Sequence, residues 1–224
     1  SDDGLEFGAS ESKYVNLFES DEHGRGVRVD VFAEDRLGDA VARLYARYAE
    51  LLTQGPERQA ATVTAEAGDG TVRLSWTDDS ERAFDPVTNE YDFEGYRIYR
   101  STDPDFLDVK VVTDGRGTDV VGNGRPNAQF DILDGRRGYS RKTIRGVAYW
   151  LGDETGITHT WTDTTVTNGQ EYYYAVCAYD YGRQSVLDSL AIYPSENSIP
   201  VSRTTRGGLI LPPNVVAVRP NPRV

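Results

Sequence analysis

The sequence predicts a mainly β protein: a β-sandwich that carries an inserted hairpin region and one N-terminal α-helix. Two runs, residues 71–76 and 95–101, place large apolar residues at every second position. Successive side chains of a strand point to opposite faces of a sheet, so a period of two indicates strand rather than helix. A third run, residues 171–179, is rich in tyrosine, which fits a pleated, half-buried surface. Turn residues separate these runs, as is typical of a sandwich.

The composition argues against several kinds of partner. The chain has 224 residues and a net charge of −12. Nucleic acids and anionic membrane surfaces attract basic proteins, so neither is expected to bind this chain. The same charge is compatible with a secreted protein and with cation binding. Cys177 is the single cysteine, so packing must hold the fold without an internal disulfide.

The chain is expected to be a processed product or a piece of a longer protein. It begins with Ser1, contains no methionine and carries no recognisable signal peptide. It also lacks an apolar run of about 18 residues, so no membrane-spanning helix is expected.

The first 58 residues are expected either to end a preceding domain or to pack on the sandwich. Residues 27–32 alternate as a strand does. Residues 35–53 are predicted to form the helix, because apolar residues recur there at spacings of three and four. Asp35 suits the N-cap, and a Gly-Pro pair at 55–56 suits the stop. The helix is expected to pack on a neighbouring sheet, with the docking of a partner as the alternative.

The main domain is expected over residues 59–205, followed by a linker, residues 206–224, that leads to a missing C-terminal region. Its strands are predicted at residues 61–66, 71–76, 92–101, 109–113, 146–151, 157–161, 171–179 and 198–202. The fifth and sixth of these are expected to pair around the turn at residues 152–156. A connection of about 55 residues follows the third strand, so an inserted hairpin region is expected across residues 114–156.

Three motifs resemble the fibronectin type III fold, which is an immunoglobulin-like β-sandwich. That family places a Trp on its second strand, Tyr-x-Ile-Tyr on its third and Tyr-x-Tyr-x-Val-x-Ala on its sixth. The matching residues here are Trp76, Tyr96, Ile98, Tyr99, Tyr172, Tyr174, Val176 and Ala178. The resemblance implies that Tyr172 is the tyrosine-corner residue, whose hydroxyl bonds the backbone at a turn. In the same register Cys177 points to the opposite face and is expected to be inert.

A closer resemblance is to large secreted or cell-surface proteins of Bacteroidetes-type bacteria. The shared runs are residues 92–104, Asp-Phe-Glu-Gly-Tyr-Arg-Ile-Tyr-Arg-Ser-Thr-Asp-Pro, and residues 152–163. In such proteins a Pro-Asn-Pro, found here at 220–222, often opens the sorting domain of type IX secretion. The resemblance implies an extracellular or cell-surface location in a bacterium.

The loop before the third strand is the most acidic stretch of the chain. From residue 78 to residue 94 it holds seven acids and one base, a net charge of −6. Calcium takes about six to eight oxygen ligands and would relieve the repulsion among these carboxylates. Asp85, Asn89 and Asp92 are the candidate ligands for a Ca²⁺ ion. A solvated acidic loop is the alternative.

No catalytic residue and no cofactor-binding motif is predicted, so the domain is not expected to be an enzyme. The two histidines, His23 and His159, lie far apart, and His159 sits within a predicted strand. The sequence lacks Gly-x-Ser-x-Gly and His-Glu-x-x-His. Its acids are plentiful, but no spacing singles out the pair that glycoside hydrolysis needs.

Aromatic residues gather in and beside the inserted region. Trp150, Trp161 and Tyr149 are the candidate binding residues, with Tyr139 nearby. If they are exposed together, they could stack on sugar rings or bury against a partner protein. Packing into the core is the alternative fate of strand aromatics.

Two functions remain open on the sequence alone. The first, which it favours, is a non-catalytic structural or adhesion module of a bacterial surface or filament-forming protein. Such a module would contact other chains or domains of the same assembly. The second is an accessory domain of a secreted hydrolase that binds carbohydrate or another substrate.

Overall fold

The computed structural model describes residues 14–20, 26–33, 60–85, 88, 90–110, 112, 122–144, 146–183 and 191–222. The chain divides into two compact units, Ser1–Leu51 and Leu52–Val224. In the first unit, β1 (Tyr14–Ser20) and β2 (Gly26–Ala33) pair as antiparallel strands. The strand predicted at residues 27–32 is therefore confirmed. The predicted helix, residues 35–53, lies outside the described residues.

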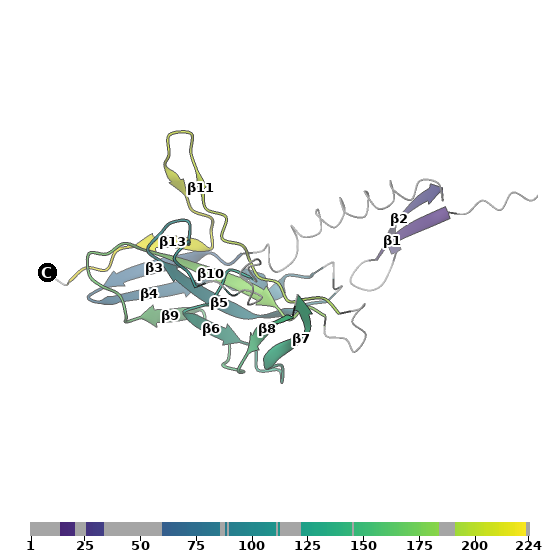
Figure 1. Ribbon diagram of the computed structural model, residues 1–224, viewed down its shortest axis with the longest axis horizontal. Helices are drawn as coiled ribbons and strands as arrows, with labels where there is room; N and C mark the ends of the chain where they lie inside the picture. Colours follow the sequence, from purple (N-terminus) through teal and green to yellow (C-terminus); the bar gives the residue numbers. More distant parts are fainter. Residues whose placement is uncertain are drawn as a thin grey trace, which may run out of the picture. The chain divides into compact units, whose positions relative to one another are not determined.

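Two antiparallel sheets form the frame of the second unit (Figure 1). The first has the strand order β3-β4-β9, with β3 at Val63–Gly68, β4 at Thr71–Trp76 and β9 at Thr160–Asp163. The second has the order β13-β10-β5-β6, with β13 at Val215–Val218, β10 at Tyr172–Asp180, β5 at Phe93–Ser101 and β6 at Ala128–Asp131. The described chain is thus mainly β, as the sequence predicts.

Side chains from both sheets meet in one hydrophobic core, so the sheets pack as a β-sandwich. Alternation along β4 buries Val72, Leu74 and Trp76 and exposes Arg73. The Trp76 ring lies edge-on to Tyr96 of β5, with ring centroids 5.7 Å apart. Such aromatic pairs add to the free energy that burial alone provides, so this contact helps to join the two sheets.

The turn that leads into β10 is held by Tyr172. Its hydroxyl accepts a hydrogen bond from the backbone N–H of Thr167 at 3.0 Å. Gly169 in the same turn has φ of 82°, a conformation that glycine adopts without steric cost. The backbone contact predicted for Tyr172 is therefore confirmed.

The other face of the four-stranded sheet carries a smaller apolar cluster, which includes Tyr99, Ala175, Cys177 and Val215. Burial raises the pKa of the Cys177 thiol well above its ordinary value. A thiol that stays protonated is a poor nucleophile, so the burial of Cys177 supports the prediction that it is inert.

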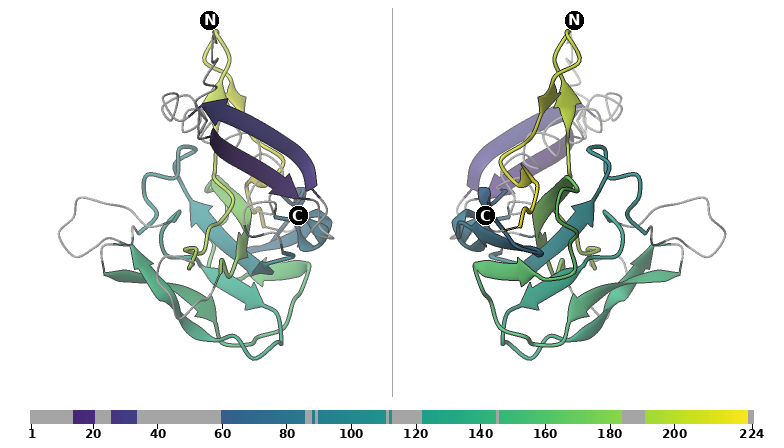
Figure 2. Two further views of the ribbon diagram at one scale, coloured as in Figure 1. Left: turned by 90° about the vertical axis from the view of Figure 1, so that its right-hand side faces the viewer. Right: turned by 90° about the vertical axis from the view of Figure 1, so that its left-hand side faces the viewer.

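Two hairpins extend from the sandwich. In one, β7 (Gly138–Ile144) pairs with β8 (Val147–Gly152); in the other, β11 (Ser202–Arg203) pairs with β12 (Leu209–Ile210). Figures 1 and 2 show the β11–β12 hairpin projecting away from the two sheets. The β7–β8 hairpin lies within the region where the sequence predicted an insertion. One turn of 3-10 helix, Asp79–Arg82, lies between β4 and β5.

The predicted pairing around residues 152–156 is wrong. Strand β8 pairs with β7, and β9 pairs with β4. The reason lies in the register: β9 sets Trp161 beside Leu74, where its ring covers the core, so β9 extends the β3-β4 sheet. Strand β8 turns back instead at Gly146, whose φ of 85° suits a tight turn.

The C-terminal predictions also need correction. Residues 198–202 do not close the sandwich, since only Ser202 belongs to a strand, the exposed β11. The closing strand is β13, within the stretch expected to be a linker. It closes the sheet because it pairs with β10 and its Val215 is buried. Over the described residues 109, 110 and 112, the strand predicted at residues 109–113 does not form.

Candidate functional site

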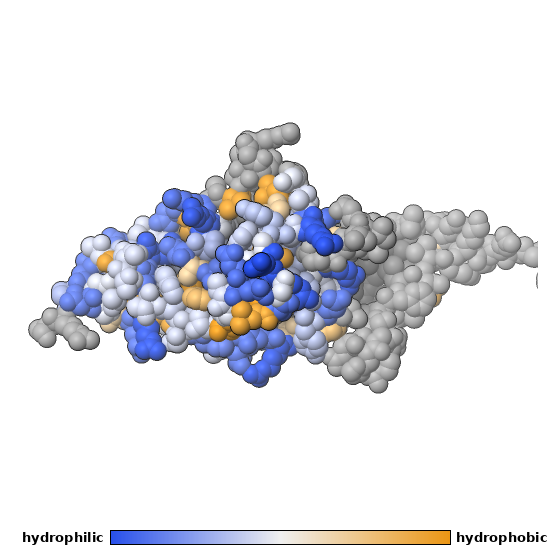
Figure 3. Space-filling view, turned by 90° about the horizontal axis from the view of Figure 1, so that it is seen from below, coloured by the Kyte–Doolittle hydropathy of each residue, from blue (hydrophilic) through white to orange (hydrophobic). Residues whose placement is uncertain are grey.

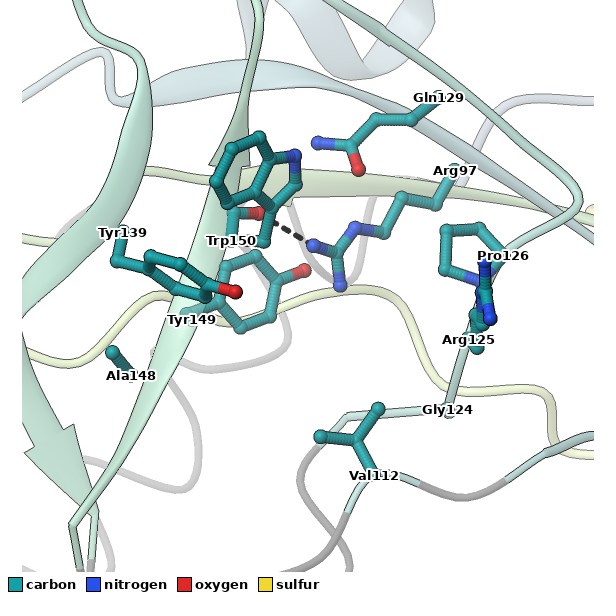
Figure 4. A pocket seen from close by; sticks show the side chains of 10 residues that line it. All are labelled: Arg97, Val112, Gly124, Arg125, Pro126, Gln129, Tyr139, Ala148, Tyr149 and Trp150. Carbon is teal, nitrogen blue, oxygen red and sulfur yellow. Dashed lines mark hydrogen bonds between the residues drawn. The ribbon is translucent and has the colours of Figure 1, made fainter.

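A pocket with a volume of about 480 Å³ lies beside the β7–β8 hairpin (Figure 4). Its size falls within the range of small-molecule sites, about 300–1,000 Å³. Strands β5, β6, β7 and β8 and the segments before β6 supply its lining, which consists of Arg97, Val112, Gly124, Arg125, Pro126, Gln129, Tyr139, Ala148, Tyr149 and Trp150. Figure 4 shows the three aromatic rings on one side, Arg125 and Pro126 on the other, and the Arg97 guanidinium between them.

The aromatic wall is a product of strand register. Tyr139 of β7 lies directly opposite Trp150 of β8, and such cross-strand neighbours project from the same face of a hairpin. Their ring centroids are 4.8 Å apart at an interplanar angle of 75°. Tyr139 is 67% exposed, so this wall is open to a ligand.

Arg97 forms the floor of the pocket. It lies on β5 and is buried, with only 7% of its side chain exposed. Its Nη2 donates a hydrogen bond to the Trp150 backbone oxygen at 2.5 Å. The guanidinium carbon lies 4.0 Å from the centroid of the Tyr149 ring and 5.1 Å from that of Tyr179. These cation–π contacts hold the charge against two rings and fix the hairpin to the sheet.

Glu196 lies beneath this floor and balances the charge of Arg97. Its Oε2 lies 3.5 Å from the Arg97 Nη1 and accepts hydrogen bonds from the Tyr99 and Tyr149 hydroxyls, each at 2.9 Å. Its other oxygen accepts a bond from the backbone N–H of Asn123. Burial and the negative charge of Glu196 raise the pKa of Tyr149 well above its ordinary value, so its hydroxyl stays protonated.

Gln129 fixes one more part of the lining. Its Nε2 donates to the Leu151 backbone oxygen at 2.8 Å and to the Tyr179 hydroxyl at 2.7 Å. Both contacts tie β6 to β8 and β10. The pocket is therefore built on paired strands with its polar side chains already held in place, which limits the ordering cost of binding a ligand.

The structure brings together two of the three predicted binding residues. Trp150 and Tyr149 line the pocket with Tyr139, whereas Trp161 lies on β9. The Trp161 ring packs against the sandwich core, 6.5 Å from the Tyr174 ring, so it is not part of the site. Sequence reasoning missed Arg97, Gln129 and Glu196, because strand pairing rather than sequence proximity places them here.

The acidic loop has two of its predicted calcium ligands among the described residues. Asp85 is 6% exposed and Asp92 is fully buried, while Asn89 lies outside the described residues. Neither oxygen of Asp92 has a hydrogen-bond partner among the described residues. Burial, with the negative charges of Asp180 and Asp85, raises the pKa of Asp92 to about 8. In the part of the chain that is described, no three acidic, histidine or cysteine side chains gather to hold a metal. Calcium therefore stays a prediction.

Glu94 is a second buried carboxyl group, two residues along the chain. It is fully buried, and in the part of the chain that is described neither of its oxygens has a hydrogen-bond partner. Burial, with the charge of Asp134 next in importance, raises its pKa to about 8. Nothing in the sequence indicated that this carboxyl group is buried, because Glu94 lies on a strand whose core face is apolar.

His159 contacts Glu81 of the 3-10 turn. Its Nε2 lies 2.6 Å from the Glu81 Oε1, which also accepts a bond from the Tyr96 hydroxyl at 3.1 Å. The centroid of the His159 ring lies 6.5 Å from that of Trp76, a residue of the core. His23 lies outside the described residues.

The comparisons with known proteins are limited in extent. No family model matches the chain. Over 80 residues the chain is 36% identical to an amylopullulanase of Thermoanaerobacter thermohydrosulfuricus, and this stretch covers 34% of the chain and 5% of that protein. The chain thus corresponds to a small part of the relative. Within the described residues, no helix has the length and hydropathy that a membrane crossing requires.

Proposed function

We propose that the sandwich is a non-catalytic, carbohydrate-binding accessory domain of a secreted polysaccharide-degrading enzyme. The observation that carries this proposal is the pocket beside Tyr139 and Trp150. Proteins bind sugars by stacking aromatic side chains on the apolar faces of the ring while polar groups meet its hydroxyls. Here the exposed Tyr139 and the half-buried Trp150 lie with Arg97, Arg125 and Gln129 in one cavity.

Two further observations support the proposal. One sheet has three strands and the other has four, and the Tyr172 hydroxyl bonds the backbone at the turn before β10. Both features support a sandwich of the fibronectin type III kind. The short stretch of similarity is to an amylopullulanase, an enzyme of polysaccharide breakdown by its name. Because the match covers so little of that enzyme, we place this chain in an accessory role, at an extracellular location.

The face seen in Figure 3 gives no sign of a broad apolar interface. The face of the described residues in Figure 3 is mainly hydrophilic, with small and separate hydrophobic areas. Large apolar patches mark stable protein contacts, and this face does not present one. A purely structural or adhesive module, the function that the sequence favours, has no need of a preformed aromatic pocket.

The decisive experiment measures sugar binding by the purified chain and by Trp150→Ala, using calorimetry against neutral and acidic oligosaccharides. Trp150→Ala should weaken binding about tenfold, because it removes one stacking face. The change keeps the Trp150 backbone oxygen, so Arg97 retains its anchor. Tyr91→Ala is the matched control, since Tyr91 is 59% exposed and lies outside the pocket. If no oligosaccharide binds the wild-type chain, the proposal fails and the structural role takes its place.

A further inference from the structure

The lining of the pocket has a charge opposite to that of the chain. It contains two arginines, Arg97 and Arg125, and no acidic residue. The chain as a whole carries 36 acids against 24 bases. The pocket is therefore a basic site in an acidic protein, and its charge bears on which sugars it accepts.

The two arginines have different environments. Arg97 is buried, and Glu196 at 3.5 Å balances its charge from the side of the sheet. Arg125 is exposed and forms no ion pair with the described residues. Its backbone N–H donates to the Lys110 oxygen at 2.8 Å, which holds the segment before β6 in place. The unbalanced positive charge at the pocket therefore belongs to Arg125.

The position of Arg125 suits a contact beside a stacked ring. Figure 4 places it across the cavity from the rings of Tyr139 and Trp150, with Pro126 next to it. A guanidinium presents two parallel N–H groups that match a carboxylate, and charge-assisted bonds of this kind are stronger than neutral ones. A sugar that stacks on the aromatic wall would turn its far edge toward this group.

We infer that the pocket takes an acidic oligosaccharide, with a uronic acid ring on the Tyr139–Trp150 wall and its carboxylate on Arg125. This inference rests on the proposed carbohydrate-binding function and names the ligand class of the same site. It also separates this chain from a domain that binds neutral glucans. A neutral sugar would leave the Arg125 charge without a counterpart.

The test compares each acidic oligomer with its own carboxyl-reduced form, which keeps the ring and loses the charge. The probes are oligogalacturonate, oligomannuronate and hyaluronan oligomers, each titrated into the purified chain by calorimetry. At least one acidic form should bind about fivefold more tightly than its reduced counterpart, the effect of one exposed charge contact. Arg125→Gln should reduce this preference to about twofold or less, because it removes the charge that distinguishes the acidic form from the reduced one.

The control is Arg73→Gln, because Arg73 is an exposed arginine on β4 outside the pocket and should not alter the preference. If the reduced forms bind as tightly as the acidic ones, the acidic ligand is refuted and the carbohydrate-binding function stands. If the preference survives Arg125→Gln, the assignment of Arg125 is refuted. If no oligosaccharide of either kind binds, the proposed function fails together with this inference.

Discussion

Glu94 of β5 is a fully buried carboxyl group without a hydrogen-bond partner among the described residues. Burial would remove the hydration of an ionised carboxylate there, and this cost together with repulsion by Asp134 outweighs the attraction of Arg136, so the group retains its proton near neutral pH. Asp92, which lies just before β5, behaves in the same way, and each has a pKa of about 8. Two buried acids of this kind make the stability of the fold depend on pH.

The direction of this dependence follows from proton counting. In the unfolded chain the pKa of Glu94 returns to its ordinary value of 4.5. Between that value and about 8, the folded state holds a proton that the unfolded state has released. Stability contributed by this group is therefore full below pH 4.5 and is lost as the pH rises toward 8.

Glu94→Gln should flatten this pH profile. The amide keeps the shape of the side chain and cannot ionise. Between pH 5 and pH 8 the free energy of unfolding should therefore fall by on the order of 2–4 kcal/mol less in the variant than in the wild type. Denaturant unfolding at four pH values measures the two slopes. Glu66→Gln, at an exposed position on β3, is the matched control and should follow the wild type. Parallel profiles for Glu94→Gln and the wild type would contradict the raised pKa.

At the scale of elements, strands in which apolar and polar residues alternate are the ones that the sequence predicts best. Strands β4, β5 and β10 were predicted because each places residues of one kind at every second position or is rich in tyrosine. Pairing order is less visible, since it depends on which strands cover the same core. The four-residue β6 was missed because so short a run has no period, although it supplies Gln129 to the pocket.

The same limit applies to the site and to the C-terminus. Tyr149 and Trp150 were predicted because aromatic side chains in an insertion are visible in one stretch of sequence. Arg97 and Glu196 come from segments far apart in the chain, and only the folded sheet unites them. Strand β13, four residues long, lies in the stretch predicted to be a linker, and its pairing with β10 is visible only in the fold.

Strand β13 provides the test at this scale. It pairs with residues 172–175 of β10, and the Pro213 oxygen just before it accepts a bond from the Val63 N–H of the other sheet at 3.0 Å. Ending the chain after residue 211 should cost on the order of 3 kcal/mol or more, because it exposes the β10 edge and the apolar area around Val215. Thermal unfolding measures the loss against a chain that ends after residue 222. Equal melting midpoints for the two chains would show that β13 does not stabilise the fold, as expected of the linker that the sequence predicted.

At the scale of the whole molecule, the net charge of −12 opposes compactness. Like charges repel each other, and the repulsion falls as salt screens it. Any cation, including sodium, should therefore raise the melting midpoint to some degree. A specific calcium site has to be separated from this general effect by holding the ionic strength constant.

The calcium prediction can then be tested through Asp92. Its buried carboxyl group has no hydrogen-bond partner within the described part of the chain, and its pKa is about 8, so calcium would have to displace a proton to bind there. Calcium chloride should raise the melting midpoint above that in sodium chloride with chelator at equal ionic strength. The increase should grow as the pH approaches 8, where the proton leaves more easily.

Asp92→Asn should abolish the calcium response while retaining the response to sodium chloride. Asp153→Asn is the control, since Asp153 is exposed and lies in another loop. Identical melting curves with calcium and with chelator across this pH range would leave the acidic loop as a solvated one. In that case burial and protonation alone, without a metal, account for Asp92 in the folded state.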